Sequence, residues 1–217
     1  MISRKIALII ICIISIINCE NDFKNYRNLK IKFVKSIKQS DLPQDFSDKA
    51  FEVVDEVIRK TVDINYEILL YFDYITGEII KCKIGEKNRI KLDFEENELK
   101  KHQIASIHNH PKSVYSPPSP QNFSIFKRKF EDYELIAGED GLWILKGKLK
   151  NEKIYLELKM ISKYLFDLAL TYSKTKSENI QEIENICDKE YGKLLLNYIN
   201  NKNINEIQLT KKEYNHD

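Results

Sequence analysis

The sequence lacks an excess of charge of either sign. Its 35 lysine and arginine residues nearly balance its 33 aspartate and glutamate residues, which leaves a formal net charge of +2. The basic residues are spread along the chain among acidic ones, as on an ordinary solvated surface. A nucleic-acid-binding protein shows a concentrated basic face, so this composition argues against a nucleic-acid partner.

Cysteine, histidine and internal repetition are scarce as well. The 217 residues include four cysteines and four histidines. The cysteines form no C-x-x-C pair, so the usual cysteine-based metal and redox motifs are missing. Cys82 and Cys187 lie outside the N-terminal segment, and they could either form a disulfide or stay reduced in a core. Without repeats, we expect one sizeable core or one core with a helical extension.

Only one long apolar run exists, and it lies at the N-terminus. Arg4 and Lys5 precede the apolar residues 6–17, a length that suits a signal peptide and is too short for a comfortable membrane span. The run ends at Cys19, after which the chain turns polar. This order resembles a bacterial lipoprotein signal, which implies cleavage before Cys19 and lipidation of that cysteine. Asn18 departs from the pattern because a small residue is usual there, and an uncleaved anchor or plain secretion are the alternatives.

The spacing of apolar residues predicts an alternation of helices and strands. Helical periodicity, alternation and turn residues such as Thr76-Gly77 define the elements. The predicted strands are residues 67–73, 78–84, 89–94, 103–107, 133–137, 142–145 and 154–160. The predicted helices are residues 47–63, 122–130, 163–172 and 177–200. This order favours an α/β or α+β arrangement of layers.

The residues that carry chemistry gather around His108 and His110, which are two of the four histidines. They are two positions apart at the end of a predicted strand, so their side chains share one face of it. Pro111 then ends the strand, and a proline-rich loop leads to Ser119 and Asn122. A catalytic zinc site needs about three protein ligands and an open position for water. Two aligned imidazoles with a third ligand nearby therefore predict a metal site.

The order His108-x-His110-Pro, seven residues, Ser119, two residues and then position 122 resembles the motif of the JAB/MPN (JAMM) metalloprotease family. The resemblance covers about residues 47–148. It implies an α/β fold with a JAB/MPN-like mixed sheet flanked by helices. It also implies that His108, His110 and residue 122 hold Zn²⁺, and that Ser119 helps to stabilise an oxyanion.

The resemblance further implies a glutamate that activates the water, near the start of the first strand after the first helix. Glu67 fits that position best, and Glu78 is the alternative. A carboxylate outside the ligand set would take up and return the proton of the water. Nothing local marks Glu67, so an ordinary carboxylate at a strand end is the competing interpretation. Helix capping likewise explains Ser119, although capping does not exclude a role at the oxyanion.

The sequence departs from the motif at position 122, which is Asn rather than Asp. An amide oxygen is neutral and binds zinc more weakly, at a cost on the order of several kcal/mol in a partly buried site. The first hypothesis is a zinc-dependent peptidase or isopeptidase-like hydrolase with Asn122 as a weak ligand. The second is a catalytically inactive JAB/MPN-like lipoprotein that acts as a binding module. The third places the functional surface on the C-terminal helices.

The histidine pair has two other interpretations. The letters His-Asn-His also occur in a group of nucleases, but those enzymes use dispersed residues on a ββα unit and a basic face that this chain lacks. Two surface histidines without a ligand role would be the default for an arbitrary His-x-His. The following proline, the spaced Ser119 and the upstream Glu67 argue against that default.

These patterns divide the chain into four parts. The parts are a signal peptide at residues 1–18, a lipidated cysteine and polar tether at 19–44, a JAB/MPN-like domain at 45–160 and a C-terminal helical extension at 161–217. We expect an exported protein that a lipid anchors to the membrane on its extracytoplasmic side. Its partner would be a peptide or isopeptide substrate if it is active, and another protein if it is not.

Overall fold

The computed structural model describes residues 21–31, 35–85, 99, 101–111, 117–147, 150–202 and 207–216. The predicted signal peptide, Cys19 and the predicted strand at 89–94 lie outside the described residues. None of the described helices is both long and apolar enough to cross a membrane.

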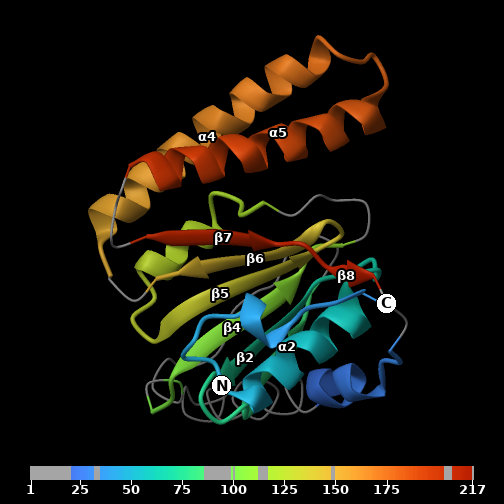
Figure 1. Ribbon diagram of the computed structural model, residues 1–217, viewed down its shortest axis with the longest axis vertical. Helices are drawn as coiled ribbons and strands as arrows, with labels where there is room; N and C mark the ends of the chain where they lie inside the picture. Colours follow the sequence, from blue (N-terminus) through green and yellow to red (C-terminus); the bar gives the residue numbers. More distant parts are fainter. Residues whose placement is uncertain are drawn as a thin grey trace, which may run out of the picture.

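A six-stranded mixed sheet forms the centre of the molecule, in the order β3-β2-β4-β5-β6-β7 (Figure 1). The strands are β2 (Ile68–Asp73), β3 (Ile79–Ile84), β4 (Ile104–Asn109), β5 (Glu131–Gly138), β6 (Gly141–Lys146) and β7 (Gln208–Lys212). Only β4 and β5 pair in parallel; the other neighbours in this sheet are antiparallel. The α/β class is therefore confirmed, and the strands predicted at 67–73 and 78–84 and at 133–137 and 142–145 form the hairpins β2–β3 and β5–β6.

Helix α2 (Asp48–Thr61) covers one face of this sheet. The Ser47 side chain caps the helix by accepting a hydrogen bond from the amide of Ala50, as its residue type predicts. The apolar stripe of α2, represented by the fully buried Val54 and Val57, packs against Leu70 of β2 and other residues of that sheet face. Burial of this stripe supplies the main hydrophobic stabilisation on this side.

Two long helices, α4 (Glu152–Lys174) and α5 (Ile180–Asn201), lie on the opposite side of the sheet (Figure 1). A second core cluster joins them to the sheet: Leu158 of α4 and Leu195 of α5 pack with Phe123, Ile136 and Trp143. Trp143 is 2% exposed and therefore belongs to the core. Cys82 and Cys187 are buried in the two different clusters and form no disulfide with each other.

The predicted strand at 154–160 is wrong, because these residues form the first turns of α4. The side chain of Asn151 accepts hydrogen bonds from the amides of Lys153 and Ile154, so it caps a helix that begins at Glu152. Alternate apolar residues are not unique to strands: Leu158 turns inward while its neighbours two positions away lie on the outer face of the helix. The cap, rather than the alternation, determines the structure here.

The predicted helix at 122–130 is shorter than expected. Residues Asn122–Phe126 form the 3-10 helix η2, which ends at Lys127 with a hydrogen bond from the Lys127 amide to the Ser124 carbonyl. The chain must then enter β5 at Glu131, and the side chain of Arg128 is drawn inward to buried carboxylates. These tertiary contacts stop the helix before its apolar pattern ends.

The polar segment expected to be a tether is folded onto the domain where it is described. Residues 21–28 are helical, and the ring of Tyr26 is 1% exposed. Ile37 and Leu42 also enter the core beneath α2. The short elements here are η1 (Gln39–Asp41) and β1 (Lys35–Ser36), which pairs with β8 (Asn215–His216). The few apolar residues of this polar segment therefore hold it against the domain.

The C-terminal extension is not only helical. After α5 the chain returns to the sheet as β7, which pairs with β6. Leu209 is 3% exposed and belongs to the core on the sheet face that carries α4 and α5. Residues 161–217 thus contain one strand of the central sheet. This strand is mostly polar, so the pattern of apolar residues does not predict it.

Candidate functional site

The two histidines of the motif meet at the end of β4, on the sheet face that carries α4 and α5. His108 is the partner of Leu69 across the β2–β4 ladder, and His110 follows the strand. Their ring centroids are 5.3 Å apart. Burial lowers the pKa of His108 to about 4, with a further contribution from Arg128. Burial and the neighbouring His108 lower the pKa of His110 to about 3, so both rings are neutral at pH 7.

Asn109, between the histidines, holds the strand end in place. Its side chain is fully buried and points to the opposite face. Its Oδ1 accepts a hydrogen bond from the Ile68 amide (2.7 Å), and its Nδ2 donates to the carbonyls of Thr61 (3.1 Å) and Tyr66 (3.0 Å). The amide thereby ties the end of α2 and the start of β2 to β4. The sequence gives no sign of this role. Because Asn109 bonds to Tyr66 and Ile68, it also fixes the residue between them, just before β2.

That residue is Glu67, the predicted base. Continuing the β2–β4 register two residues beyond the Leu69–His108 pair places Glu67 opposite His110, on the same face as both rings. Burial raises the pKa of Glu67 to about 7. The alternative, Glu78, lies at the far end of β2, where its carbonyl accepts from the Asp73 amide. Six strand residues separate the two positions by about 20 Å, so Glu78 is not brought to the histidines.

Asn122 and Ser119, the other two predicted site residues, are joined by their side chains. The Oδ1 atom of Asn122 accepts hydrogen bonds from both the amide and the hydroxyl of Ser119, each at 2.7 Å. The Nδ2 atom donates to Oε1 of Glu134 at 2.7 Å and faces Nε2 of His108 at 3.4 Å. Asn122 is the first residue of η2 and is 8% exposed.

The orientation of the Asn122 amide follows from its partners. The backbone N–H of Ser119 can only donate, so the atom facing it must be the amide oxygen. The amide NH₂ must then face Glu134 and His108. If the amide were reversed, its oxygen would face the carboxylate of Glu134 and its NH₂ would face another donor. The observed orientation is the one in which every contact is favourable.

Glu134, on β5, links this pair to an arginine. It is 5% exposed, and its Oε2 accepts a hydrogen bond from Nη2 of Arg128 at 2.7 Å. Its Oε1 lies 3.8 Å from Nδ1 of His108, close enough for electrostatic attraction but too far for a hydrogen bond. A neutral His108 with its proton on Nδ1 and its lone pair on Nε2 suits both neighbours, Glu134 and the NH₂ of Asn122.

A second buried carboxylate completes the network. Glu131 is fully buried and accepts hydrogen bonds from Nε of Arg128 and from the hydroxyl of Ser106. Arg128 also donates to the hydroxyl of Ser124 at 2.5 Å. Burial raises the pKa of Glu131, an effect that Arg128 opposes. Sequence reasoning missed this network, although the spacing of three between Arg128, Glu131 and Glu134 was a visible signal.

Helix α5 closes over the loop that carries Ser119. The hydroxyl of Tyr191 donates to the carbonyl of Pro118 at 2.8 Å, and Tyr191 is 3% exposed. The next residue, Gly192, lies so close to the Trp143 ring that a Cβ atom there would be 3.1 Å from it. The C-terminal helices therefore help to build the wall of the site as well as the core.

Comparison of the chain with protein-family models, with curated proteins and with solved structures finds no match. The resemblance to the JAB/MPN family accordingly rests on the motif residues themselves.

The site residues as they stand do not fit a zinc ion. Among the residues that the structure describes, no three His, Cys, Asp or Glu side chains are arranged to hold a metal. The oxygen of Asn122 is occupied by two donors of Ser119, and its NH₂ lies on the Nε2 side of His108. Coordination by Asn122 would require the amide to turn, which would break both bonds to Ser119 and set its oxygen against Glu134.

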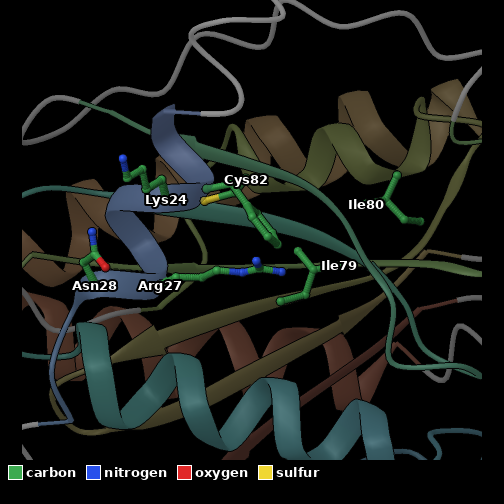
Figure 2. Close-up of a pocket in the computed structure, with 7 residues that line it drawn as sticks. Lys24, Arg27, Asn28, Ile79, Ile80 and Cys82 are labelled. Atoms are coloured by element: carbon green, nitrogen blue, oxygen red, sulfur yellow. The ribbon is translucent and has the colours of Figure 1, made fainter.

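A separate concave site lies beside the edge strand β3 (Figure 2). Its volume is about 430 Å³, and its lining consists of Phe23, Lys24, Arg27, Asn28, Ile79, Ile80 and Cys82. Figure 2 shows Arg27 directed toward Ile79. Cys82 pairs with Leu70 and shares its core cluster, which is the α2-covered side of the sheet. This pocket is therefore remote from the histidines, which lie on the other face.

Proposed function

We propose that this chain is a JAB/MPN-like domain in which a hydrogen-bonded side-chain network replaces the metal centre, and that it acts as a protein-binding module. The proposal includes a lipid-anchored position on the extracytoplasmic side of a bacterial membrane. The observation that carries it is the orientation of Asn122, whose NH₂ rather than its oxygen faces Nε2 of His108. In this orientation the N–H hydrogens of Asn122 point to the place next to His108 Nε2 where a metal ion would sit.

The hydrogen-bond pairing within the network supports this proposal. Both polar ends of the Asn122 side chain have partners, and Glu134 is balanced by Arg128. Removing a buried donor or acceptor from such a network costs about 1–3 kcal/mol for each group that is left unpaired. Zinc binding would therefore have to offset the loss of several hydrogen bonds while gaining only a neutral third ligand.

Zinc titration of the purified protein by calorimetry tests the proposal. We expect no binding at micromolar zinc by the wild type, and tight binding by Asn122→Asp, because a carboxylate supplies both the charge and the acceptor that the amide lacks. Adding His108→Ala to Asn122→Asp should abolish that binding, which ties the signal to this site. Tight zinc binding by the wild type that His108→Ala removes would overturn the proposal.

One observation favours the second candidate, the zinc-dependent peptidase or isopeptidase. Glu67 has a pKa of about 7 and shares a sheet face with two neutral histidines. A carboxyl group that titrates near neutral pH is well suited to general base catalysis, and the Ser119 hydroxyl would support an oxyanion. Zinc-dependent hydrolysis of peptide or isopeptide substrates, lost in Glu67→Gln and kept in Glu78→Gln, would establish this alternative.

A further inference from the structure

The pocket between the helical residues 23–28 and the edge strand β3 takes no part in the histidine site. We call this cavity the β3 pocket; its volume is about 430 Å³ (Figure 2). Pockets that bind small ligands have volumes of about 300–1,000 Å³, and their walls are mostly apolar with a few polar groups that orient the ligand. The β3 pocket therefore has the size of a ligand site, and its lining indicates which ligand it suits.

One wall of the β3 pocket is a single face of the N-terminal helix. Phe23, Lys24, Arg27 and Asn28 line the pocket, and residues three and four apart on a helix are neighbours on its surface. Tyr26 lies on a different side of this helix, where it is 1% exposed and belongs to the domain core. Burial of the Tyr26 ring thus orients the helix so that both of its basic residues reach the pocket.

Arg27 is arranged to bind an anion. Its guanidinium carbon lies 4.2 Å from the centroid of the Phe23 ring. This contact holds the guanidinium group in place and leaves its positive charge intact. Figure 2 shows the Arg27 side chain directed toward Ile79 of β3, across the pocket from the helix. A guanidinium group binds phosphate or carboxylate through two parallel N–H···O hydrogen bonds.

The described acidic residues do not neutralise the charge of the β3 pocket. Lys24 and Arg27 are both exposed, and neither forms an ion pair with a carboxylate in the part of the chain that the structure describes. The acidic residue of the helix, Asp22, does not line the pocket, and its carbonyl accepts a hydrogen bond from the thiol of Cys82. The pocket therefore presents two positive charges, which favour an anionic occupant.

The apolar part of the pocket favours an anion that carries hydrocarbon. Ile79 and Ile80 of β3 and Phe23 of the helix contribute partly exposed apolar side chains to the lining. A bare inorganic phosphate would leave this surface in contact with water. The glycerol and first methylene groups of a phospholipid would cover it, and removal of apolar surface from water is favourable.

The place of the pocket along the chain favours a membrane lipid. Phe23 follows Cys19 by four residues, and even a fully extended chain spans no more than about 14 Å over that length. In the proposed function a lipid on Cys19 enters the membrane, and the inference rests on the proposed function at this step. The anchor would raise the local concentration of phospholipid around the pocket, and not that of free phosphate or of an acidic peptide. Basic side chains beside apolar ones are also what binds a peripheral helix to anionic lipid.

We propose that the β3 pocket binds the headgroup of an anionic phospholipid, with its phosphate on Arg27 and Lys24 and the adjoining hydrocarbon against Phe23 and Ile79. A single point of attachment leaves the orientation of a domain at the membrane undetermined, and this second contact determines it. The histidines lie on the other face of the sheet and take no part.

Titration of the purified full chain with dihexanoyl phosphatidylglycerol, a water-soluble short-chain lipid, tests the proposal. Hydrogen exchange with mass spectrometry, in a nonionic detergent, reports binding at the amides of residues 21–28 and of β3. We expect this lipid to slow exchange there with a dissociation constant about fivefold or more below that of dihexanoyl phosphatidylcholine, because the second lipid has the same chains but no net charge.

Arg27→Gln should raise the dissociation constant for phosphatidylglycerol by about fivefold, since it removes one of the two charges. The matched control is Lys30→Gln, which removes an equal charge from an exposed residue outside the pocket and should leave the constant unchanged. Equal affinity for the two lipids, or an equal effect of both substitutions, would overturn the proposal. So would equal protection by inorganic phosphate or by hexaglutamate, which would assign the pocket to a free anion or to an acidic protein segment.

Flotation of the full chain with vesicles of phosphatidylcholine alone tests the anchor separately, because these vesicles offer no anionic headgroup. A chain that does not float but binds short-chain phosphatidylglycerol through Arg27 would support the pocket and contradict the anchor. A chain that floats but shows no preference between the short-chain lipids would support the anchor and overturn the pocket. The zinc titration of the histidine site is independent of both results.

Discussion

A single amide, that of Asn122, determines what the histidine site can do. Its oxygen is held by Ser119, so its NH₂ faces a neutral imidazole and a carboxylate that is paired with Arg128. An ionised Asp at this position would carry the same number of non-hydrogen atoms with no donor at all. The difference between the two residues is therefore one of proton arrangement as well as charge.

Asn122→Asp should destabilise the metal-free protein. The new carboxylate would face that of Glu134 at hydrogen-bond distance and would lose the donor that His108 now receives. We expect the free energy of unfolding in EDTA to fall by about 2–4 kcal/mol, and zinc to restore it. Urea unfolding with and without zinc measures both effects. As a control, Ser119→Ala should cost about 1 kcal/mol with no response to zinc. Equal stability of Asn122→Asp and wild type in EDTA would contradict the proposed network.

Asp188 on α5 should make stability depend on pH. Burial, with contributions from Glu184 and Asp140, raises the pKa of Asp188 to about 6. The folded state therefore binds a proton more tightly than the unfolded state, and stability is lost as pH rises from about 4 through 6. Asp188→Asn should stabilise the protein by about 1–2 kcal/mol at pH 7, after allowance for solvent screening, and have no effect at pH 4.

Urea unfolding at intervals between pH 4 and 7 measures this difference. The exposed Asp167 of α4 provides the control, since Asp167→Asn should leave the pH dependence of stability unchanged. A constant offset between Asp188→Asn and wild type across the range would show that the carboxylate does not titrate as expected.

At the scale of elements, α5 acts as a support for the loop at residues 117–121. Its Tyr191 hydroxyl reaches the Pro118 carbonyl, while the ring packs edge-on against Phe166 with centroids 5.7 Å apart. The position of Ser119, and through it that of Asn122, therefore depends on a helix about 70 residues further along the chain. The proline-rich loop alone therefore does not fix the position of Ser119; the contact with α5 is needed as well.

Tyr191→Phe should loosen this loop without unfolding the core. Loss of the hydrogen bond should cost about 1 kcal/mol, since the ring and its packing remain. We expect faster hydrogen exchange at the amides of residues 119–126 and unchanged exchange in β5 and β6. Tyr198→Phe is a matched control, because it removes a hydroxyl that bonds to Glu157 far from the loop. Equal exchange in both variants would argue against the support role.

For the molecule as a whole, the C-terminal strand joins the extension to the central sheet of the domain. Ile207, Leu209 and Tyr214 are each at most 8% exposed. Strand β7 also covers the edge of β6, whose backbone groups would otherwise be open to pairing with other chains. A C-terminal truncation that removes the helices also removes this strand.

Truncation after residue 206 should therefore destabilise the entire fold. Burial of each lost apolar side chain contributes about 1.5–3 kcal/mol, so we expect the Tm to fall by at least about 10 °C, with aggregation. Truncation after Tyr214 keeps β7 and should change the Tm by only a few degrees. Differential scanning calorimetry compares the two. A core that melts normally without β7 would mean that the division near residue 160 separates independent parts.

Local patterns predicted most of the elements correctly. Ser47 caps α2, Thr76-Gly77 turns between β2 and β3, and the apolar run before His108 forms β4, because each of these features depends on residues within one turn or strand. The prediction of a strand at 154–160 was wrong because its apolar residues fit both strand alternation and helical spacing. The helix η2 is shorter than predicted because Arg128 pairs with the buried carboxylates of Glu131 and Glu134. Polar strands such as β7 lack the apolar alternation from which a strand is predicted.

Local sequence patterns are enough to predict that two histidines share a sheet face, that a serine and an amide lie three residues apart nearby, and that the layers are α/β. Strand periodicity and residue identity suffice for these conclusions. Which end of the Asn122 amide faces His108 depends on the fold, because Glu134 and Arg128 come from segments that are adjacent only in the folded chain. Continued by two residues, the β2–β4 register sets Glu67, and not Glu78, opposite His110, and strand register is a long-range property that local patterns do not reveal.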